Sequence, residues 1–519
     1  MIKIEWNDVQ TPIFISIWIV FVVIIKIIFH ASEKLVIIFP DSALLIIAGF
    51  SVGTVLDWIL PAHDIYLDPD LFFIYLLPPI VLEAGFFLPS EIFFRNIGTI
   101  LIFAVVGTLW NIISIAGILY LFSSFYTMEI TFLNLTLFST LISAVDPVAV
   151  LSVFTEVRVN ELLYICVFGE SLLNDAVTIV LYHALTDMNF IGGAHLELTD
   201  FVRASGSFFL VSLGGLLIGT LFALLAGLGT KAARKLPVVQ PLICLLLPYL
   251  SYLLAEMFHF SGILSIVACG LLMKSYIKAN MSDEPRVTVK YFLKTISSSV
   301  GSCHFYFPGS INVFQEPQLG CCVYPCDCSF LSILSLCEFK KLALIFWDSY
   351  VTENVLKKSG FLINSSLHME ARLRGAICYG LAMTLDKTTV PAKDTLVSTT
   401  VVVICFTVFI QGMSIKPLVK FLRVKTKEST QSAVTSFIFT NAQEDLLAGI
   451  EAIAGIRGKH YTRRLILQLD REYIQPFLTH KENLRGDNLI EQYGELSALA
   501  EKERQAEAKN KTSMLLANF

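Results

Sequence analysis

Charged residues are scarce in this chain. Asp, Glu, Lys and Arg make up 16% of its 519 residues, and 55% are hydrophobic. Soluble domains carry about 25% charged residues, so this composition excludes an ordinary soluble globular domain and predicts a polytopic membrane protein with a polar remainder. The net charge of −5 is diffuse, and we expect no nucleic-acid partner.

Two further features are missing. The first residues, Met1 to Gln10, hold no basic segment and no small-residue cleavage site, so we expect no removable signal peptide. The eleven cysteines form no zinc-binding pattern, because five are scattered through apolar runs as small buried hydrophobes and six cluster at 303–337. We therefore expect no cofactor and no structural metal.

Long apolar runs dominate the chain instead, and a run of about 20 residues can cross a bilayer as a helix. A shorter run near 70–89 is interrupted by Pro78-Pro79. Basic residues fall in alternate gaps, so the positive-inside rule places the N-terminus outside and the tail after Lys420 in the cytoplasm. The runs lie near 12–29, 38–60, 97–122, 131–154, 162–185, 207–230, 241–258, 261–277, 375–390 and 396–421.

The stretch from 280 to 371 departs from this pattern. Both of its ends are expected to be cytoplasmic, so zero or two crossings must lie within it. Its best candidate, near 329–347, is broken by charged residues. We therefore divide the chain into a transmembrane domain at 1–421, with an atypical cysteine-rich segment at 297–370, and a cytoplasmic tail at 422–519.

One carboxylate lies inside an apolar run, next to a proline. Asp146 precedes Pro147 in the run Ser143–Val150. Proline removes a backbone donor and biases its predecessor away from the helix, so we expect the helix to unwind here. Unwound backbone at this depth is tolerated where it lines a cavity, and its freed carbonyls can help to hold a cation. The alternative is a proline kink with a satisfied aspartate.

A second carboxylate, Asp175, lies on the next apolar run. Ser171 shares its helix face, while Glu170 and Asn174 share the adjoining one. With Thr178, these residues offer the oxygen ligands that Na⁺ prefers. A carboxylate at mid-membrane depth is costly and rarely persists without a function. If it holds a proton or a cation, but not both, it can exchange one for the other. The alternative is a structural pairing with a buried basic group.

Three more charged residues stand near apolar runs. Glu83 and Glu256 fit a polar helix-packing contact and a supporting role in an ion pathway equally well. Arg374 enters a run, where it either snorkels to the interface or neutralises a carboxylate. We favour the second interpretation for Arg374.

The tail has a helical pattern with one apolar stripe and arginines away from it. Such a helix lies on the bilayer, fills the groove of a partner, or packs on the inner face of its own protein. The sequence leaves all three open. The stripe consists of Tyr461, Leu465, Ile466, Leu469, Tyr473 and Phe477.

At these residues the chain resembles the animal sodium/proton exchangers of the cation/proton antiporter superfamily. The resemblance implies an all-α, inverted-repeat polytopic fold of about 10–12 transmembrane helices with a helical cytoplasmic tail. It also implies electroneutral Na⁺/H⁺ antiport, without enzymatic activity, by alternating access around Asp175 and Asn174, with Asp146 at the unwound crossing and Glu170 as a supporting acid. The matching stretches are 72–85, 143–150, 168–182, 255–262, 374–376 and 411–425.

The same resemblance implies partners and a location. We expect a calcineurin B homologous EF-hand protein on the tail helix, a homodimer, and the plasma membrane or an organelle membrane as the site of action. Li⁺ and K⁺ stay open as alternatives to Na⁺.

The chain also departs from the family, which has two spans between about 296 and 371 where this chain has its atypical segment. The second repeat is therefore incomplete unless that segment supplies both crossings. This leaves a non-transporting or regulatory product of the family as the alternative function. An intramembrane aspartyl protease is a weaker rival, because neither Asp146 nor Asp175 has the Gly-x-Gly-Asp sequence that it requires.

Overall fold

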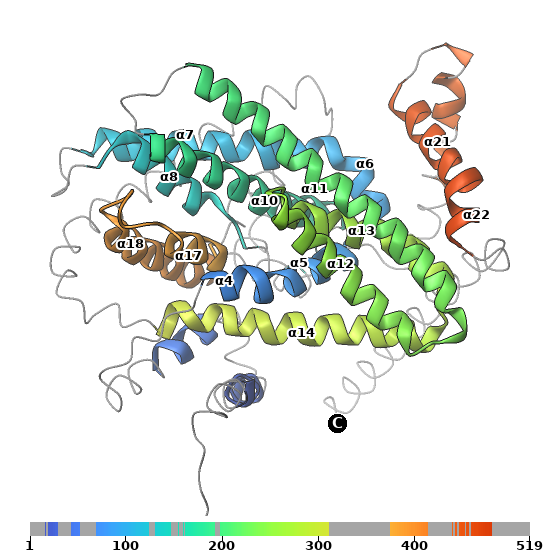
Figure 1. The fold of residues 1–519 in the computed structure, drawn as a ribbon, viewed down its shortest axis with the longest axis horizontal. Coiled ribbons are helices and arrows are strands. Elements are labelled where there is room, and N and C mark those ends of the chain that lie inside the picture. The colour runs from blue at the N-terminus through green and yellow to red at the C-terminus, as the bar shows by residue number, and fades with distance from the viewer. Residues whose placement is uncertain are drawn as a thin grey trace, which may run out of the picture. The chain divides into compact units, whose positions relative to one another are not determined.

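The computed structural model describes the chain in segments, and the elements in these segments are helices (Figure 1). The all-α expectation is therefore confirmed for this part of the chain. Pro147 and residues 311–373, which include most of the atypical segment, lie outside the described residues. The described segments are 19–29, 43–51, 69–123, 130–146, 161–191, 198–310, 374–413, 446–451 and 458–479, with a few isolated positions.

The chain forms two compact units, and the helices between residues 198 and 310 run from one into the other. The first unit holds Met1–Phe222, Pro248–Leu271 and Lys290–Lys425. The second holds Ala223–Leu247, Leu272–Val289 and Thr426–Phe519.

Within the described residues, seven helices are long and apolar enough to cross a membrane, and two shorter apolar helices lie at Ile19–Phe29 and Phe132–Ser143. Several helices extend beyond the apolar runs, because a helix continues past the first polar residue that ends a run. The seven are Pro69–Phe87, Ser90–Leu121, Leu163–Phe190, Val202–Lys235, Val239–Met257, Gly262–Asn280 and Lys393–Gln411.

The two prolines near residue 78 do not interrupt their helix. α4 (Pro69–Leu71), the π-helical turn η1 (Phe72–Leu76) and α5 (Leu77–Phe87) follow one another without a gap. Pro78 and Pro79 lie in the first turn of α5, where the preceding wider turn disrupts the regular hydrogen-bond ladder. The sequence interpretation of an interrupted run is wrong here.

The elements around residues 130–190 and 374–413 pack together in the first unit. α6 (Ser90–Leu101), η2 (Ile102–Val106) and α7 (Gly107–Leu121) form one long helix that packs against α8 (Phe132–Ser143) and α10 (Glu161–Ile191).

α17 (Ala376–Met383) packs against α8 and α18 (Lys393–Phe406), which continues as η6 (Thr407–Gln411). Figure 1 shows α17 and α18 side by side. α17 is half the length of the predicted 375–390 run, because a turn begins at Thr384.

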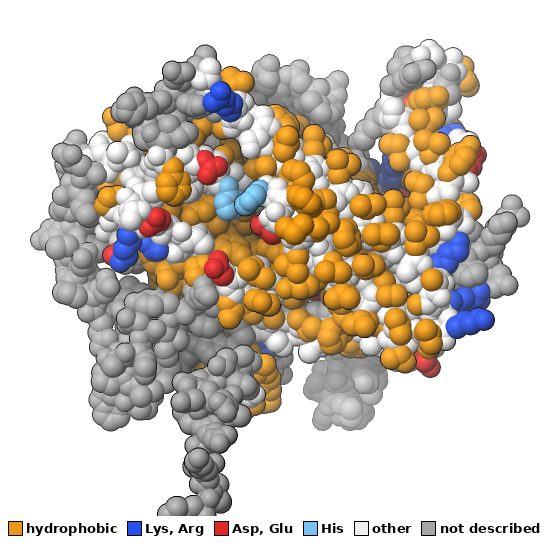
Figure 2. Space-filling view, viewed as in Figure 1, with side chains coloured by type: hydrophobic (Ala, Val, Ile, Leu, Met, Phe, Trp, Pro, Cys, Tyr) orange, Lys and Arg blue, Asp and Glu red, His pale blue; other side chains and the backbone are white. Residues whose placement is uncertain are grey.

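α11 (Leu198–Ala232) presents large apolar side chains on its surface, and apolar side chains cover much of the face seen in Figure 2. A helix that is apolar on its exposed side suits a lipid environment. α12 (Val239–Met257), α13 (Gly262–Asn280) and α14 (Asp283–Ser310) follow it along the chain. The exposed residues of α11 include Phe209, Leu210, Leu213, Leu217 and Leu221.

Two glycines let α11 approach α13 closely. A Cβ added at Gly215 would lie 2.4 Å from the carbonyl oxygen of Ser261, and one at Gly219 would lie 2.2 Å from that of Ser265. Lipid tails provide no hydrophobic force between helices, so such close packing between small residues holds helices together in membranes. The spacing of four residues puts both glycines on one face of α11.

We predict that Gly219→Ala lowers the thermal unfolding temperature of the full chain, because its methyl group meets a backbone carbonyl that cannot rotate away. Overpacking of this kind costs about 1–3 kcal/mol. Gly206→Ala is the matched control on the same helix, since nothing lies within 4 Å of its added Cβ. Equal melting of the two variants in detergent would contradict the close contact.

Candidate functional site

The candidate site lies where two helices give way to extended backbone. α8 ends at Ser143, and Ala144 is extended, with φ −63° and ψ 137°. α17 begins after Gly375, which is also extended, with φ −128° and ψ −165°. A Cβ added at Gly375 would lie 2.5 Å from the Cβ and from Oδ2 of Asp146, so the two extended segments are in direct contact. Residue 375 has room only for glycine.

The carbonyls released at the end of α8 accept hydrogen bonds from side chains of α10. Asn174 Nδ2 donates to the Ser143 oxygen at 3.1 Å, and Ser171 Oγ donates to the Val145 oxygen at 2.6 Å. Both contacts are buried. A buried carbonyl without a partner is costly, so these side chains stabilise the unwound backbone beside Asp146.

The carbonyl between these two is held from the other side, by α17. Arg374 Nη1 donates to the Ala144 oxygen at 3.1 Å, and Cys378 Sγ donates to the same oxygen at 3.2 Å. The carbonyls that the sequence offered as cation ligands therefore each accept a protein donor. A cation at this site would depend mainly on the carboxylates.

Asp175 is buried in the same region and keeps one oxygen without such a partner. Its side chain is 6% exposed, and its Oδ1 is buried without a hydrogen-bond partner. The carboxylate accepts a hydrogen bond from the Val145 backbone and interacts electrostatically with Asp146. Thr178 Oγ1 donates to Asn174 Oδ1 at 3.0 Å, which orients the amide next to it. Two ionised carboxylates here repel each other, and a bound cation or proton would relieve that repulsion.

Arg374 and Glu170 are also buried, with exposures of 7% and 4%. The backbone N–H of Arg374 donates weakly to Thr407 Oγ1, at 3.4 Å. The guanidinium of Arg374 is therefore inside the protein, beside the extended segment that carries Asp146. Its role in neutralising a carboxylate stays a prediction.

Glu256 and Glu83 lie on other helices. Glu256 Oε1 accepts a hydrogen bond from the Gly262 backbone at 3.1 Å and so links the end of α12 to the start of α13. This contact favours the packing interpretation for Glu256. Glu83 is on α5, four residues before Phe87, whose ring centroid is 5.2 Å from Lys294 Nζ.

Sequence reasoning missed Cys378 and Thr407 as neighbours of the site. Cys378 follows Arg374 by four residues, so helical spacing would have put both at the start of one helix face. Its carbonyl partner could not be found, because the contact joins positions 234 residues apart. Nothing in the sequence around Thr407 indicates a role at the site, because a single threonine in an apolar run is common.

The tail helix is docked by its C-terminal end on α11 and α13, within the second unit. It comprises α21 (Lys459–Leu469), η7 (Asp470–Ile474) and α22 (Gln475–Leu478). Asn280 Nδ2 donates to the Leu478 oxygen at 2.9 Å and Lys231 Nζ donates to the Phe477 oxygen at 2.6 Å. Tyr276 OH donates to Asp470 Oδ1 at 3.0 Å. These bonds leave the apolar stripe uncovered.

The apolar stripe points away from this dock. Leu465 and Leu469 are about half exposed, and Ile466, Tyr473 and Phe477 are about two-thirds exposed. Such a surface is available to a partner or a bilayer, while packing of the stripe on the inner face of the protein is not seen in the described residues.

Comparison with known proteins identifies the family. The family model described as "Sodium/hydrogen exchanger, transmembrane" matches residues 19–421, which hold the whole candidate site and the atypical segment. Sodium/hydrogen exchanger 5 of Homo sapiens is 38% identical over 485 residues, which is 93% of this chain and 54% of that protein. Sodium/hydrogen exchanger 3 of Mus musculus is 37% identical over 504 residues, which is 96% of this chain and 60% of that protein.

The chain thus spans little more than half the length of these relatives. Among solved structures, the sodium proton antiporter MjNhaP1 from Methanocaldococcus jannaschii at pH 8 aligns with a TM-score of 0.57 and 19% identity, covering 80% of this chain and 99% of the antiporter. That likeness shows a shared fold, and with the apolar helices it makes this a multi-pass membrane protein. The chain belongs to the sodium/hydrogen exchanger family.

Proposed function

We propose that this chain is a secondary transporter that exchanges Na⁺ for H⁺ by alternating access around Asp175, and that it is not an enzyme. The single observation that carries the proposal is the unpartnered, buried Oδ1 of Asp175 beside Asp146. A buried carboxylate oxygen without a hydrogen-bond donor is a suitable place for a proton or a hard cation. The family of the chain agrees with this chemistry.

The exchange follows from competition for one group. Asp175 binds a proton or takes part in a cation site with Asp146, but the positive charge of the one excludes the other. Asn174 and Ser171 hold the extended backbone in place, and Glu170 supplies a further buried acid on the same helix. If the site carries one Na⁺ in one direction and one H⁺ in the other, a complete transport cycle moves no net charge across the membrane. Exchange driven by Li⁺ or K⁺ in place of Na⁺ would be measured in a test of cation selectivity.

A non-transporting role in the same family is the second candidate, because the segment 297–370 does not resemble the two spans expected there. The measurements below separate the two, since only a transporter gives Na⁺-driven proton movement.

The proposed setting is the plasma membrane, with the tail in the cytoplasm and a calcineurin B homologous EF-hand protein on its apolar stripe. The exposed stripe and the basic residues at the ends of α11 and α13 support this orientation. A homodimer is proposed from the family resemblance alone.

Asp175→Asn should abolish Na⁺-dependent recovery of cytosolic pH after an acid load, in cells that lack other exchangers. An amide neither ionises nor carries the proton, so the loss should be complete while surface expression is kept. Asp187→Asn, an exposed acid on the same helix, is the control and should keep the wild-type rate. Sodium-driven recovery in the Asp175 variant would exclude Asp175 as the exchanging group.

The rate of exchange should not depend on membrane potential. Moving one net charge would contribute about 2.3 kcal/mol per 100 mV, which is a large effect on a rate. Purified protein in vesicles is clamped at two potassium diffusion potentials, and Na⁺-driven proton flux is recorded at each. Clearly different fluxes would rule out one-for-one exchange.

Replacing both Leu465 and Leu469 with Gln in the full chain should weaken binding of the EF-hand partner. Both leucines are about half exposed, so burying the rest of them is worth about 1.5–3 kcal/mol, and the affinity should fall at least about tenfold. Leu467→Gln is the matched control, because Leu467 is equally exposed but lies off the stripe. Unchanged affinity of the double variant would favour a bilayer contact for the stripe.

A further inference from the structure

α17 is short for an element of a membrane site. Ala376–Met383 is eight residues long, and isolated helices of that length are not stable in themselves. At its start, α17 is attached to the extended segment by Arg374 and Cys378, which share the Ala144 carbonyl. The orientation of α17 therefore depends on what holds its other end.

A hydrogen bond to α10 holds that other end. Tyr182 OH and Thr384 Oγ1 are 2.8 Å apart, and Thr384 is the residue that follows α17. Thr384 Oγ1 also donates to the Leu381 oxygen at 2.7 Å. Because a hydroxyl has one proton, Thr384 then accepts from Tyr182. The tyrosine of α10 is thus connected to the last turn of α17.

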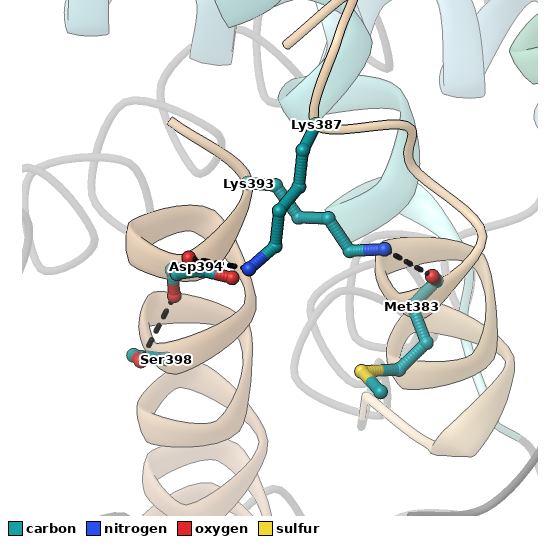
Figure 3. Close-up of polar contacts among 5 residues, drawn as sticks. All are labelled: Met383, Lys387, Lys393, Asp394 and Ser398. Carbon is teal, nitrogen blue, oxygen red and sulfur yellow. Dashed lines mark hydrogen bonds and ion pairs between the residues drawn. The ribbon is translucent and has the colours of Figure 1, made fainter. Parts of the chain in front are cut away.

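A second contact at this end has a different partner. Figure 3 shows Lys393, at the start of α18, reaching the Met383 oxygen, at 2.8 Å, and Lys387 paired with Asp394. The first contact joins the last residue of α17 to α18, and the second joins the turn between them to α18. The Lys387–Asp394 pair is largely exposed, so it contributes little to stability. The bond from Tyr182 is the one that ties α17 to the helix carrying Asp175.

The position of Tyr182 fits this role. It follows Asp175 by seven residues, which is two turns on the same helix face and about 10 Å along α10. Its side chain is 4% exposed and belongs to an apolar cluster with residues of α8, α17 and α18. Breaking this hydrogen bond would leave the Tyr182 hydroxyl with Thr186 and the Thr384 hydroxyl with the Leu381 oxygen, and neither of these contacts connects α10 to α17.

We propose that Tyr182 and Thr384 are a positioning pair for the ion site. Their hydrogen bond fixes the end of α17 on α10, so that Arg374 and Gly375 at its start stay aligned with Asp146 and Asp175. The consequence for transport rests on the proposed exchange function, whereas the attachment of α17 does not.

The test uses full-chain variants that keep side-chain volume. Tyr182→Phe and Thr384→Val each remove the bond, and Thr384→Ser keeps it. Thr400→Val is the matched control, because this buried hydroxyl donates to Leu396 within α18. Hydrogen exchange of the α17 amides is measured on each purified variant, together with the Na⁺ concentration for half-maximal exchange and the maximal rate.

We expect faster exchange of the 376–383 amides in Tyr182→Phe and in Thr384→Val. The double variant should change by less than the sum of the two, because both remove the shared bond and each removes one further contact, with Thr186 or with Leu381. The half-saturating Na⁺ concentration should rise by about two- to tenfold, the range for one net hydrogen bond, with a smaller effect on the maximal rate. Thr384→Ser should keep both the α17 exchange rate and the half-saturating Na⁺ concentration at their wild-type values.

Unchanged α17 exchange in the two volume-keeping variants would overturn the proposal, and so would an equal change in Thr400→Val. Faster α17 exchange with an unaltered half-saturating Na⁺ concentration would also overturn it, since the pair would then stabilise without positioning. A wild-type chain that moves no Na⁺ would reject the proposed function instead, and the α17 amides would still decide whether the attachment exists.

Discussion

Polar groups buried in a membrane protein must find partners within the protein, and this constraint shapes the region around Asp175. Unwinding the backbone after Ser143 releases carbonyls at a depth where lipid offers no donors. Ser171 and Asn174 of α10 donate to two of them, and Arg374, just before α17, and Cys378 of α17 donate to the third. The helices that carry the chemistry are also the helices that make the unwound backbone tolerable.

The same constraint explains why one unsatisfied oxygen stands out. Where most polar groups are paired, a lone buried carboxylate oxygen is held at a high free energy until a proton or a cation reaches it. The hydrogen bonds of Asn174 and Ser171 hold the extended backbone beside it in place.

Much of this could be predicted from the sequence. The length of the apolar runs predicted a membrane protein. The pair Asp146-Pro147 indicated that the helix would end near these residues, as α8 does. Helical spacing put Ser171 and Asp175 on one face of α10. The partners across the site could not be predicted, because Arg374 lies 230 residues from the carbonyl that it binds. Two helix boundaries were also predicted wrongly. Pro78-Pro79 does not interrupt its helix, and α17 ends at Met383, seven residues before the predicted end of the run at 390.

The contact of α11 with α13 sets unequal limits on how the two helices can vary in sequence. On α11 the contact uses the missing side chains of Gly215 and Gly219, so any other residue there is excluded by size. Facing α11, the contact uses the backbone carbonyls of Ser261, just before α13, and of Ser265, and the Cβ of Ala268 would lie 3.0 Å from a Cβ added at Gly219. α11 is therefore held to glycine at this contact, and α13 to small residues such as Ser265 and Ala268, both of which are buried.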